Sequence, residues 1–359
     1  MVTAVHQFVA TFEPGAIGNE IIEAQNVLRA AGYESDVFTE FGHESYAGNW
    51  KHYTEYAKHA SDDDVLVYHM AIGSNVADWL LDRPERIVLR HHNITPVEFY
   101  SPWPDANTYG MAWGRDQLRR FAPRAVLGLA ASEFNRQELE ALRFRKTAVA
   151  PVFFDFAAFD RPIDTEPTDE RLNADRSGTE WLFVGWLAPH KCQHDIILAF
   201  ALYKKLFDAN ATLQLVGRTA LDSYEQSCRK LVGELGLEAS VLFRGRVSDQ
   251  ELGEAYQHAD VFVCMSEHEG VGLPLLESMH TGLPIVAFGA AAVPETMGDG
   301  GLVLPNKKPA TVAAAAHRLI NDQALKDTLT ANARSHLQHF DFDAAKSAWL
   351  REIQSVVAS

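Results

Sequence analysis

Cysteine is scarce in this sequence of 359 residues, and the three cysteines are not arranged for a structural role. Cys192, Cys228 and Cys264 lie far apart in the second half of the chain. Zinc sites and disulfide frameworks need cysteines at short or regular spacings. We therefore interpret these residues as reduced thiols and expect a cytoplasmic protein.

Long hydrophobic runs are also missing. No stretch reaches about 18 apolar residues without a charge, so no transmembrane helix is predicted. The start, MVTAVHQFVATFEPG, lacks a basic segment and soon reaches Glu13, which is not typical of a signal peptide. With 47% hydrophobic and 22% charged residues the composition is that of a globular chain, and its length predicts two domains.

Excess positive charge, which a nucleic-acid-binding domain usually carries, is absent as well. The formal net charge is −16, so we expect no nucleic-acid partner. One segment, residues 115–146, has an excess of positive charge, with eight basic and four acidic residues. It is either a solvated helix face or a surface for anionic lipid or a phosphate-bearing acceptor, which would place the protein at the inner face of the plasma membrane. Nothing in the sequence indicates an oligomeric state.

Short apolar runs alternate with helical patterns along the first half. Residues 20–33 have apolar side chains at helical spacing, and residues 114–126 resemble a short basic helix. The apolar runs predict strands buried on both faces, as in parallel sheets, over residues 3–10, 64–70, 86–92 and 125–132.

The alternation stops at residues 155–179, an acidic segment without apolar periodicity that we interpret as a linker. It then restarts, with strands predicted over residues 180–185, 212–217, 240–245, 260–265 and 284–288. The predicted fold class is therefore α/β, with two Rossmann-like, doubly wound parallel-sheet domains. Because such sheets bind ligands at the carboxyl ends of their strands, we expect the site in a cleft between two facing domains.

The most informative segment is MSEHEGVGLPLLESMHTGLP, residues 265–284. It leaves a predicted strand and enters a helix through glycines, so backbone N–H groups can approach an anion at the helix N-terminus. Glu269 precedes the turn and Glu277 lies one turn inside the helix, which gives an E-x7-E spacing. A carboxylate there can accept hydrogen bonds from sugar hydroxyls, although a solvated Glu277 and a capping Glu269 would give the same pattern.

Three further turns carry candidate residues. Lys191 follows a strand in FVGWLAPHKCQHD and suits a diphosphate, although an isolated lysine is more often an ordinary surface residue. Gly15 and Gly18 lie in FEPGAIGNE, an incomplete dinucleotide-binding pattern whose glycines would let a substrate approach the backbone. Strand-end histidines such as His69 and His92 either orient a substrate or serve the structure.

Together these residues resemble the GT-B glycosyltransferases, specifically the large retaining family 4. The E-x7-E segment EGVGLPLLE carries the resemblance most specifically, supported by FVGWLAPHK and by ASEFNRQELEAL, residues 131–142. The stretch HHNITPVEFY, which begins at His91 and contains Asn93, resembles mannosyltransferases that assemble O-antigen chains.

The resemblance implies an N-terminal acceptor-side domain (1–165), a nucleotide-sugar-binding domain (166–342) and a C-terminal helix (343–359) that crosses back to the first domain. It places Lys191 on the donor diphosphate, Glu277 on the ribose and Glu269 on the hexose, with His92 beside the reacting carbon. The Gly15–Gly18 loop would lie near the donor phosphate and the acceptor. Backbone amides that hold the hexose and phosphate would be those of Gly270, Val271, Gly272 and Leu273.

One position departs from the family pattern. Most relatives have an arginine that assists phosphate binding where this chain has Trp186. We expect either Arg218 to supply the missing charge or donor binding to be weaker, with Trp186 stacking or filling space. His69, Asn93 and Trp186 are further candidates for substrate contacts.

The predicted function is transfer of a hexose, with retention, from a nucleotide-diphosphate sugar to a hydroxyl of a glycan or lipid-linked acceptor. GDP-mannose is the preferred donor through the subgroup resemblance. No Asp-x-Asp motif is placed to hold a metal, so we expect neither a metal nor another cofactor. The alternatives are a sugar-nucleotide 2-epimerase of the same architecture and a non-catalytic binding subunit of a polysaccharide assembly complex.

Overall fold

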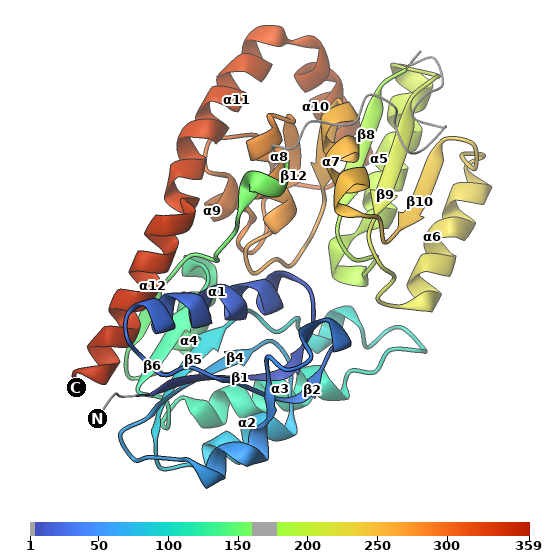
Figure 1. The fold of residues 1–359 in the computed structure, drawn as a ribbon. Coiled ribbons are helices and arrows are strands. Elements are labelled where there is room, and N and C mark those ends of the chain that lie inside the picture. Colours follow the sequence, from blue (N-terminus) through green and yellow to red (C-terminus); the bar gives the residue numbers. More distant parts are fainter. Residues whose placement is uncertain (1–3, 160–177) are drawn as a thin grey trace. The chain divides into compact units, whose positions relative to one another are not determined.

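The structure is a computed structural model that describes residues 4–159 and 178–359 (Figure 1). The chain forms two compact units. Unit 1 comprises the residues up to Glu98, Asn107–Phe154 and Phe340–Ser359, and unit 2 comprises Phe99–Ala106 and Asp155–His339. Each unit has its own sheet and its own hydrophobic core.

Unit 1 is built on a seven-stranded sheet in which every paired neighbour is parallel. The strand order is β3-β2-β1-β4-β5-β6-β7. Every residue of the central strand β4 is buried, as expected for a sheet covered on both faces. The strands are β1 (Val5–Phe12), β2 (Val37–Gly42), β3 (Lys51–His52), β4 (Val65–Met70), β5 (Arg86–His91), β6 (Leu127–Ala130) and β7 (Thr147–Val149).

Helices cover both faces of this sheet, and the two larger hydrophobic clusters that they enclose lie on opposite faces. One cluster contains Phe8 and Tyr68 together with residues of α2 (Asn75–Leu81) and α3 (Tyr109–Phe121). The other contains Val67 with residues of α1 (Ala16–Ala30) and α12 (Phe342–Val357). The remaining helix of this unit with α geometry among the described residues is α4 (Glu133–Ala141).

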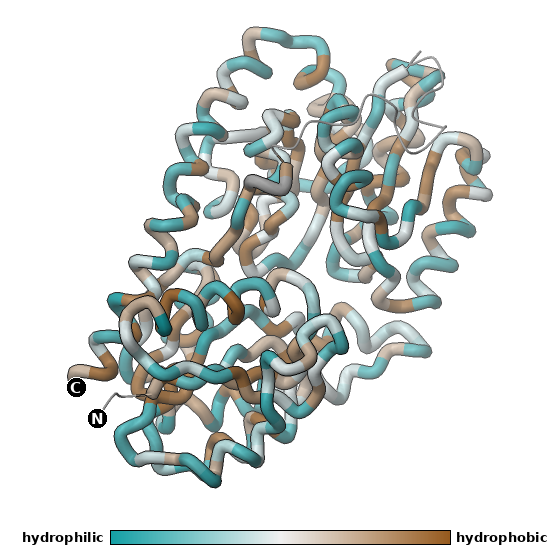
Figure 2. Tube along the Cα trace, in the orientation of Figure 1, coloured by the Kyte–Doolittle hydropathy of each residue, from teal (hydrophilic) through white to brown (hydrophobic). Residues whose placement is uncertain are grey.

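The C-terminal helix α12 is part of unit 1. Hydrophilic and hydrophobic residues alternate along it (Figure 2), and its apolar face is buried against the sheet through Trp349 and Ile353. The side chain of Arg86 on β5 donates to the carbonyl of Val356, at 2.8 Å, and thereby anchors the end of the helix. The chain therefore returns to its first unit after completing the second.

Unit 2 has a six-stranded sheet, also parallel throughout, in the order β10-β9-β8-β11-β12-β13. The two parallel α/β sheets confirm the predicted fold class. The strands are β8 (Glu180–Val184), β9 (Thr212–Val216), β10 (Val241–Gly245), β11 (Val261–Cys264), β12 (Ile285–Phe288) and β13 (Leu302–Leu304). The helices are α5 (Gln193–Leu206), α6 (Asp222–Glu234), α7 (Asp249–His258), α8 (Leu273–Thr281), α9 (Val293–Met297), α10 (Pro309–Asn321) and α11 (Gln323–His336).

The chain first enters unit 2 at a point that the sequence patterns did not indicate, and it enters this unit again at the start of the predicted linker. Residues Phe99–Ala106 leave the first half of the chain and belong to unit 2. The start of the predicted linker forms the short helix η4 (Phe156–Phe159), where the ring of Phe156 stacks on His280 of α8 at 4.7 Å between centroids. The rest of that linker up to residue 177, with the predicted boundary at 165/166, lies outside the described residues.

Candidate active site

The loop between β11 and α8 presents backbone amides at a helix N-terminus. Gly272 is the N-cap of α8 with φ +85°, a conformation that favours glycine, and Pro274 follows in the first turn. Thr296 on α9 donates its hydroxyl to the carbonyl of Val271 at 2.5 Å, which fixes the loop. Gly270, Val271, Gly272 and Leu273 therefore lie between the carboxyl end of β11 and the first turn of α8, and their binding of an anion stays a prediction.

Lys191 and Glu269 form an ion pair. The Lys191 ammonium lies 2.6 Å from both carboxylate oxygens of Glu269, and the side chains are only 18% and 10% exposed. Lys191 ends the short helix η5 (Pro189–Lys191) after β8, and Glu269 follows β11, the neighbouring strand. Residues 78 positions apart thus meet because parallel neighbours end at one edge of the sheet. The sequence predicted both residues at the donor but not their contact.

Glu277 is buried inside the first turns of α8. Only 8% of the residue is exposed, and the hydroxyl of Tyr256 on α7 donates to its carboxylate. Burial raises the pKa of Glu277 to about 7, although the Tyr256 hydrogen bond acts in the opposite direction. The structure therefore does not place Glu277 as a solvated helix residue. Tyr256 is a partner that the sequence patterns did not single out.

Arg218 and Trp186 lie against each other at the ends of two adjacent strands. The Arg218 guanidinium lies 5.2 Å from the centroid of the Trp186 ring, which is a cation–π contact. The amide of Leu187 donates to the carbonyl of Arg218 at 2.9 Å, so the two turns are joined through the backbone. Trp186 is 52% exposed. A cation therefore lies beside the position where relatives carry their arginine.

A segment from the first half of the chain packs beside this site. The rings of Phe99 and Tyr100 lie 6.1 and 5.8 Å from the buried ring of His190, the residue before Lys191. Phe99 also lies 6.0 Å from the ring of His268, the residue before Glu269. Sequence reasoning missed this neighbour, because residues 99–106, FYSPWPDA, have no periodic pattern that would assign them to either domain.

In unit 1, His69 and His92 are joined by a hydrogen bond of 2.9 Å between Nδ1 of His69 and Nε2 of His92. Nε2 of His69 lies 3.0 Å from Oε1 of Gln7, whose amide nitrogen donates to the carbonyl of Ile21 at 2.9 Å. Since that carbonyl can only accept, the Gln7 oxygen must accept from His69. The proton of His69 is then on Nε2, its Nδ1 accepts from His92, and His92 carries its proton on Nε2.

This series of hydrogen bonds leaves Nδ1 of His92 without a proton, so the atom keeps its lone pair. Burial and the nearby charge of Arg90 hold the pKa of His92 well below its usual value, so the ring is neutral. Because His92 follows β5, its free nitrogen is an acceptor at the carboxyl edge of the sheet. Gln7, which determines the arrangement, stands in the middle of the first apolar run and gave no signal in the sequence.

The neighbours of His92 are held by polar partners on α4. Asn93 has φ +83° and donates its side-chain amide to Asn135 of α4 at 2.9 Å. His91 contacts Glu138 at 2.8 Å, and this hydrogen bond, with the charge of Arg115, outweighs the effect of burial and lowers the pKa of Glu138 to about 2.

The Gly15–Gly18 turn begins α1 at the carboxyl end of β1. A side-chain carbon on Gly18 would lie 2.1 Å from the carbonyl oxygen of Glu13, so this glycine is required by the tight turn itself. Gly15, the N-cap, has φ +155° and no heavy atom within 4 Å of such a carbon. The space beside Gly15 is open, and the approach of a substrate to this backbone stays a prediction.

Two groups of side chains in the described ranges have a spacing that a metal ion could use. The first contains Glu20, His69 and His92. Arg90 donates to Glu20 at 2.7 Å, and both ring nitrogens of His69 have partners, so the protein itself occupies several of these ligand atoms. The second contains Cys192, His194 and Asp195, and the ammonium of Lys307 lies 2.6 Å from Asp195.

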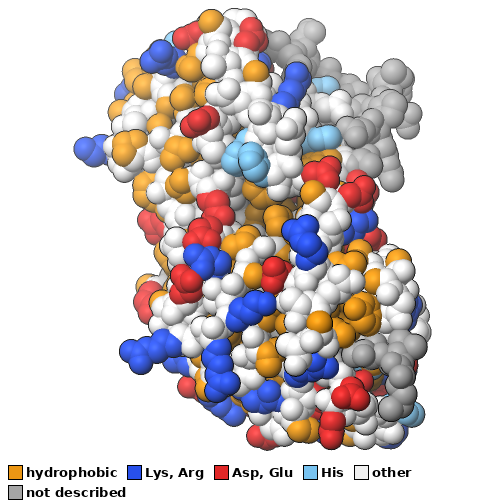
Figure 3. Space-filling model, turned by 90° about the vertical axis from the view of Figure 1, so that its left-hand side faces the viewer, with side chains coloured by type: hydrophobic (Ala, Val, Ile, Leu, Met, Phe, Trp, Pro, Cys, Tyr) orange, Lys and Arg blue, Asp and Glu red, His pale blue; other side chains and the backbone are white. Residues whose placement is uncertain are grey.

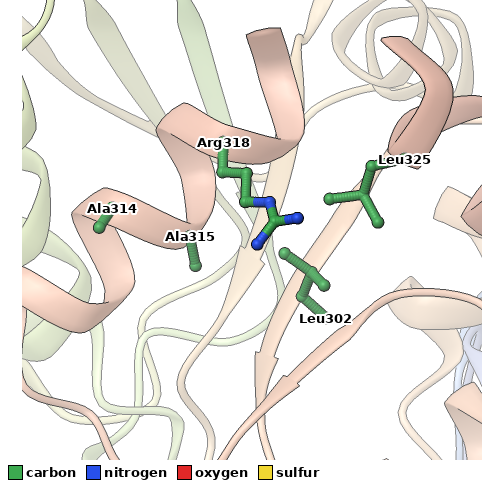
Figure 4. Close-up of a pocket in the computed structure, with 5 residues that line it drawn as sticks. All are labelled: Leu302, Ala314, Ala315, Arg318 and Leu325. Carbon is green, nitrogen blue, oxygen red and sulfur yellow. The ribbon is translucent and has the colours of Figure 1, made fainter. Parts of the chain in front are cut away.

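A separate cavity of about 370 Å³ lies between α10, α11 and the amino end of β13 (Figure 4). Its wall is apolar except for Arg318, whose guanidinium points into it, and it contains none of the predicted site residues. The lining residues are Leu302, Ala314, Ala315, Arg318 and Leu325. The cavity lies at the amino end of its strand, whereas Lys191 and Glu269 lie at the carboxyl ends of theirs.

Half of the eight basic residues in the segment 115–146 form ion pairs within unit 1. Arg115 pairs with Glu138, Arg120 with Asp78, Arg136 with Glu133 and Glu140, and Lys146 with Glu352. On the face drawn in Figure 3, basic and acidic side chains are likewise mixed. No helix in the described part of the chain is long and apolar enough to cross a membrane.

Comparison with known proteins assigns this architecture. Residues 164–336 match the family described as glycosyl transferases group 1. The chain is 26% identical over 281 residues to the O-antigen chain mannosyltransferase B of Escherichia coli, covering 77% of this chain and 71% of that protein. It is 29% identical over 206 residues to the D-inositol 3-phosphate glycosyltransferase of Frankia alni, covering 55% of this chain and half of that protein.

Solved structures share the whole fold. Sucrose-phosphate synthase from Thermosynechococcus elongatus superposes with a TM-score of 0.76 at 18% identity and covers 99% of both chains. Anabaena HepE in complex with UDP and glucose gives a TM-score of 0.77 at 19% identity and covers 98% of this chain and 100% of its own. At these identities the likeness establishes the fold alone.

Proposed function

We propose that the protein is a retaining hexosyltransferase that moves mannose from GDP-mannose, because residues 164–336 match the group 1 glycosyl transferases and the chain has the GT-B fold. The proposed acceptor is a hydroxyl of a glycan or lipid-linked glycan in polysaccharide assembly of the O-antigen type. The similarity to the E. coli O-antigen mannosyltransferase supports this choice of donor and acceptor.

The observation that carries the proposal is the Lys191–Glu269 pair beside the N-terminus of α8. In transfer from a nucleotide-diphosphate sugar, negative charge builds on the leaving diphosphate while the anomeric carbon becomes cationic. Lys191, Arg218 and the amides before α8 supply positive potential for the diphosphate. When the diphosphate binds Lys191, the carboxylate of Glu269 is released from the Lys191 ammonium. It can then accept hydrogen bonds from hydroxyls of the hexose.

His92 has the complementary role in unit 1. Its neutral ring offers Nδ1 as an acceptor, so it can bind a sugar hydroxyl beside the reacting carbon without adding a positive charge there. A protonated ring would repel the positive charge that develops on the anomeric carbon, whereas a neutral ring does not. We therefore assign His92 to orientation of the reacting hexose, with Gln7 and His69 as positioning residues.

Lysine, arginine and the helix dipole would do in this protein what a divalent metal does in other transferases. The proposed reaction accordingly needs no metal and no further cofactor. The proposed location is the cytoplasm, where nucleotide sugars are the donor pool, with the residual basic side chains of residues 115–146 contacting the inner face of the membrane.

Product analysis tests the proposal. Purified protein is incubated with GDP-mannose or UDP-glucose, with and without a lipid-linked glycan acceptor, and products are separated by chromatography and assigned by NMR. We expect an α-mannosidic product from GDP-mannose only when acceptor is present. Free nucleotide with an altered free sugar in the absence of acceptor would instead identify a sugar-nucleotide epimerase, and bound but unchanged donor would identify a binding subunit.

A further inference from the structure

A second cavity, of about 510 Å³, opens in unit 1 at the amino ends of the strands. Its lining includes His6 near the start of β1, Asp36 immediately before β2, Lys51 at the start of β3 and Asp64 immediately before β4. His69 and His92 lie at the carboxyl ends of the same sheet. The cavity is therefore distinct from the candidate active site, and its volume is in the range of small-molecule sites.

Two nearly buried polar groups on its floor have unused hydrogen-bonding capacity. His6 is 6% exposed, and its Nδ1 accepts from the backbone N–H of Asp36 at 3.1 Å. Because a backbone N–H can only donate, the proton of the neutral ring is on Nε2. Burial lowers the pKa of His6 against the pull of Asp64, Asp36 and Glu34, in agreement with a neutral ring. No residue in the described part of the chain accepts from Nε2.

Asp64 is the acceptor on the same floor. It is 5% exposed, and its Oδ2 accepts both from the hydroxyl of Tyr56, at 2.8 Å, and from the amide of Ser61, at 3.0 Å. The other oxygen, Oδ1, has no hydrogen-bond donor among the residues that the structure describes. The rings of Phe38 and Tyr56, which contact His6 edge-on, complete the wall.

The charges around the cavity select against an anion. Four carboxylates line it, those of Glu34, Asp36, Asp63 and Asp64, against one ammonium, Lys51, which is bound to Asp36 at 2.6 Å. A phosphate or a nucleotide would therefore be repelled. The donor substrate of the active site does not fit here.

A metal ion does not fit either. With its proton on Nε2, His6 offers a donor to the cavity where a cation would need a lone pair. The groups with metal-ligand spacing in residues 4–159 and 178–359 lie elsewhere. A hydroxyl, in contrast, accepts from one group and donates to another, so neighbouring hydroxyls satisfy a donor and a carboxylate together.

We propose that this cavity binds a neutral sugar residue, with His6 Nε2–H donating to one hydroxyl and Asp64 accepting from a neighbouring one. The site lies outside the transferase centre and would hold a sugar unit of a glycan independently of the donor. The inference does not rest on the identity of the transferred sugar.

The test is ligand-observed NMR and calorimetry on the full chain with neutral methyl hexosides, among them methyl α-mannoside, in the presence of saturating GDP and UDP. Three variants are compared with the wild type. Ser61→Trp places a bulky side chain at the exposed mouth without altering a buried group. His6→Phe keeps the aromatic packing but removes the donor. Lys58→Trp, on the same short helix as Tyr56 but outside the lining, is the matched control.

We expect weak, millimolar binding of at least one hexoside by the wild type and by Lys58→Trp, with a loss of about tenfold or more in Ser61→Trp and His6→Phe. Binding should be unchanged in Lys191→Ala, which separates this site from the transferase centre. Absence of hexoside binding in the wild type, or binding that survives Ser61→Trp, would overturn the proposal. Binding of calcium or a diamine that is lost in Ser61→Trp, with no hexoside bound, would also overturn it.

Discussion

The ammonium of Lys191 lies within 2.6 Å of both carboxylate oxygens of Glu269, in a setting where both side chains are largely buried. An ion pair in such a place leaves an uncompensated charge when one partner is removed. A nucleotide diphosphate offers the lysine an alternative partner of the same sign as the glutamate. Donor binding and release of Glu269 are therefore expected to be coupled.

Removal of the lysine charge should abolish transfer. For Lys191→Ala we expect kcat/KM for the donor to fall by two or more orders of magnitude, since an electrostatic contact to a developing charge contributes on the order of 3 kcal/mol. Lys191→Arg should retain part of the activity because the charge remains. Initial rates of both variants provide the measurement, and rates of Lys191→Ala within a few-fold of wild type would contradict the assigned role.

The pH dependence of nucleotide binding should follow Glu277. With a pKa of about 7, the carboxyl is partly protonated at neutrality. In the ribose-binding role that we propose for Glu277, only the ionised form could accept hydrogen bonds from two ribose hydroxyls. We expect nucleotide affinity to rise between pH 6 and pH 8 in the wild type. Glu277→Gln should bind more weakly at pH 8 and lose this dependence. An equally steep rise in that variant would assign the titration to another group.

The free energy of unfolding should also depend on the protonation of Glu277, but it should fall with rising pH where nucleotide affinity rises. The folded-state pKa lies above the unfolded value, so the folded protein binds the extra proton between about pH 4.5 and pH 7. The contribution of Glu277 to the free energy of unfolding is therefore lost as the pH rises through this window, by roughly 3 kcal/mol. Urea unfolding of wild type and Glu277→Gln at both ends of the window measures it, and a pH-independent difference between the two would contradict it.

Trp186 should act through Arg218. A cation–π contact at an exposed site contributes about 0.5–1 kcal/mol, so Trp186→Ala should weaken donor binding roughly twofold to fivefold, and Trp186→Phe less. Arg218→Ala should weaken it about tenfold or more. The double variant should be no weaker than Arg218→Ala alone. Additive losses in calorimetry would show that Trp186 contacts the donor independently of Arg218.

Gln7 should determine the tautomer of His92. Gln7→Met keeps the volume but removes both hydrogen bonds, so His69 loses its fixed orientation. We expect the nitrogen-15 spectrum of the wild type to show His92 protonated on Nε2, and the variant to show a mixture of tautomers with a several-fold lower kcat and little change in donor KM. A wild-type His92 protonated on Nδ1 would refute the proposed chain of hydrogen bonds.

The sequence patterns predicted the central strands of both sheets because these are buried on both faces and read as continuous apolar runs. They missed the outer strands β3, β7 and β13, which have two or three residues each. They also missed β2, which carries polar residues within its six. Short or partly polar strands are set by pairing with a neighbour rather than by their own composition.

The same limit applies to the site. Lys191, Glu269 and Glu277 lie in motifs with a recognisable spacing, so their places at one sheet edge could be predicted. Gln7, Tyr256 and Phe99 act through contacts with residues at least 14 positions away, which no local pattern encodes. Partners that orient a functional group are thus the part that only the folded chain reveals.

The central claim is that this protein binds a nucleotide-diphosphate sugar without a metal. Calorimetric titration with GDP, UDP, ADP and dTDP, first with a chelator and then with magnesium, tests it most directly. We predict tight binding of GDP in preference to the other three, with the same affinity in both conditions. Binding that requires magnesium, or no binding of any of the four nucleotides, would contradict the account.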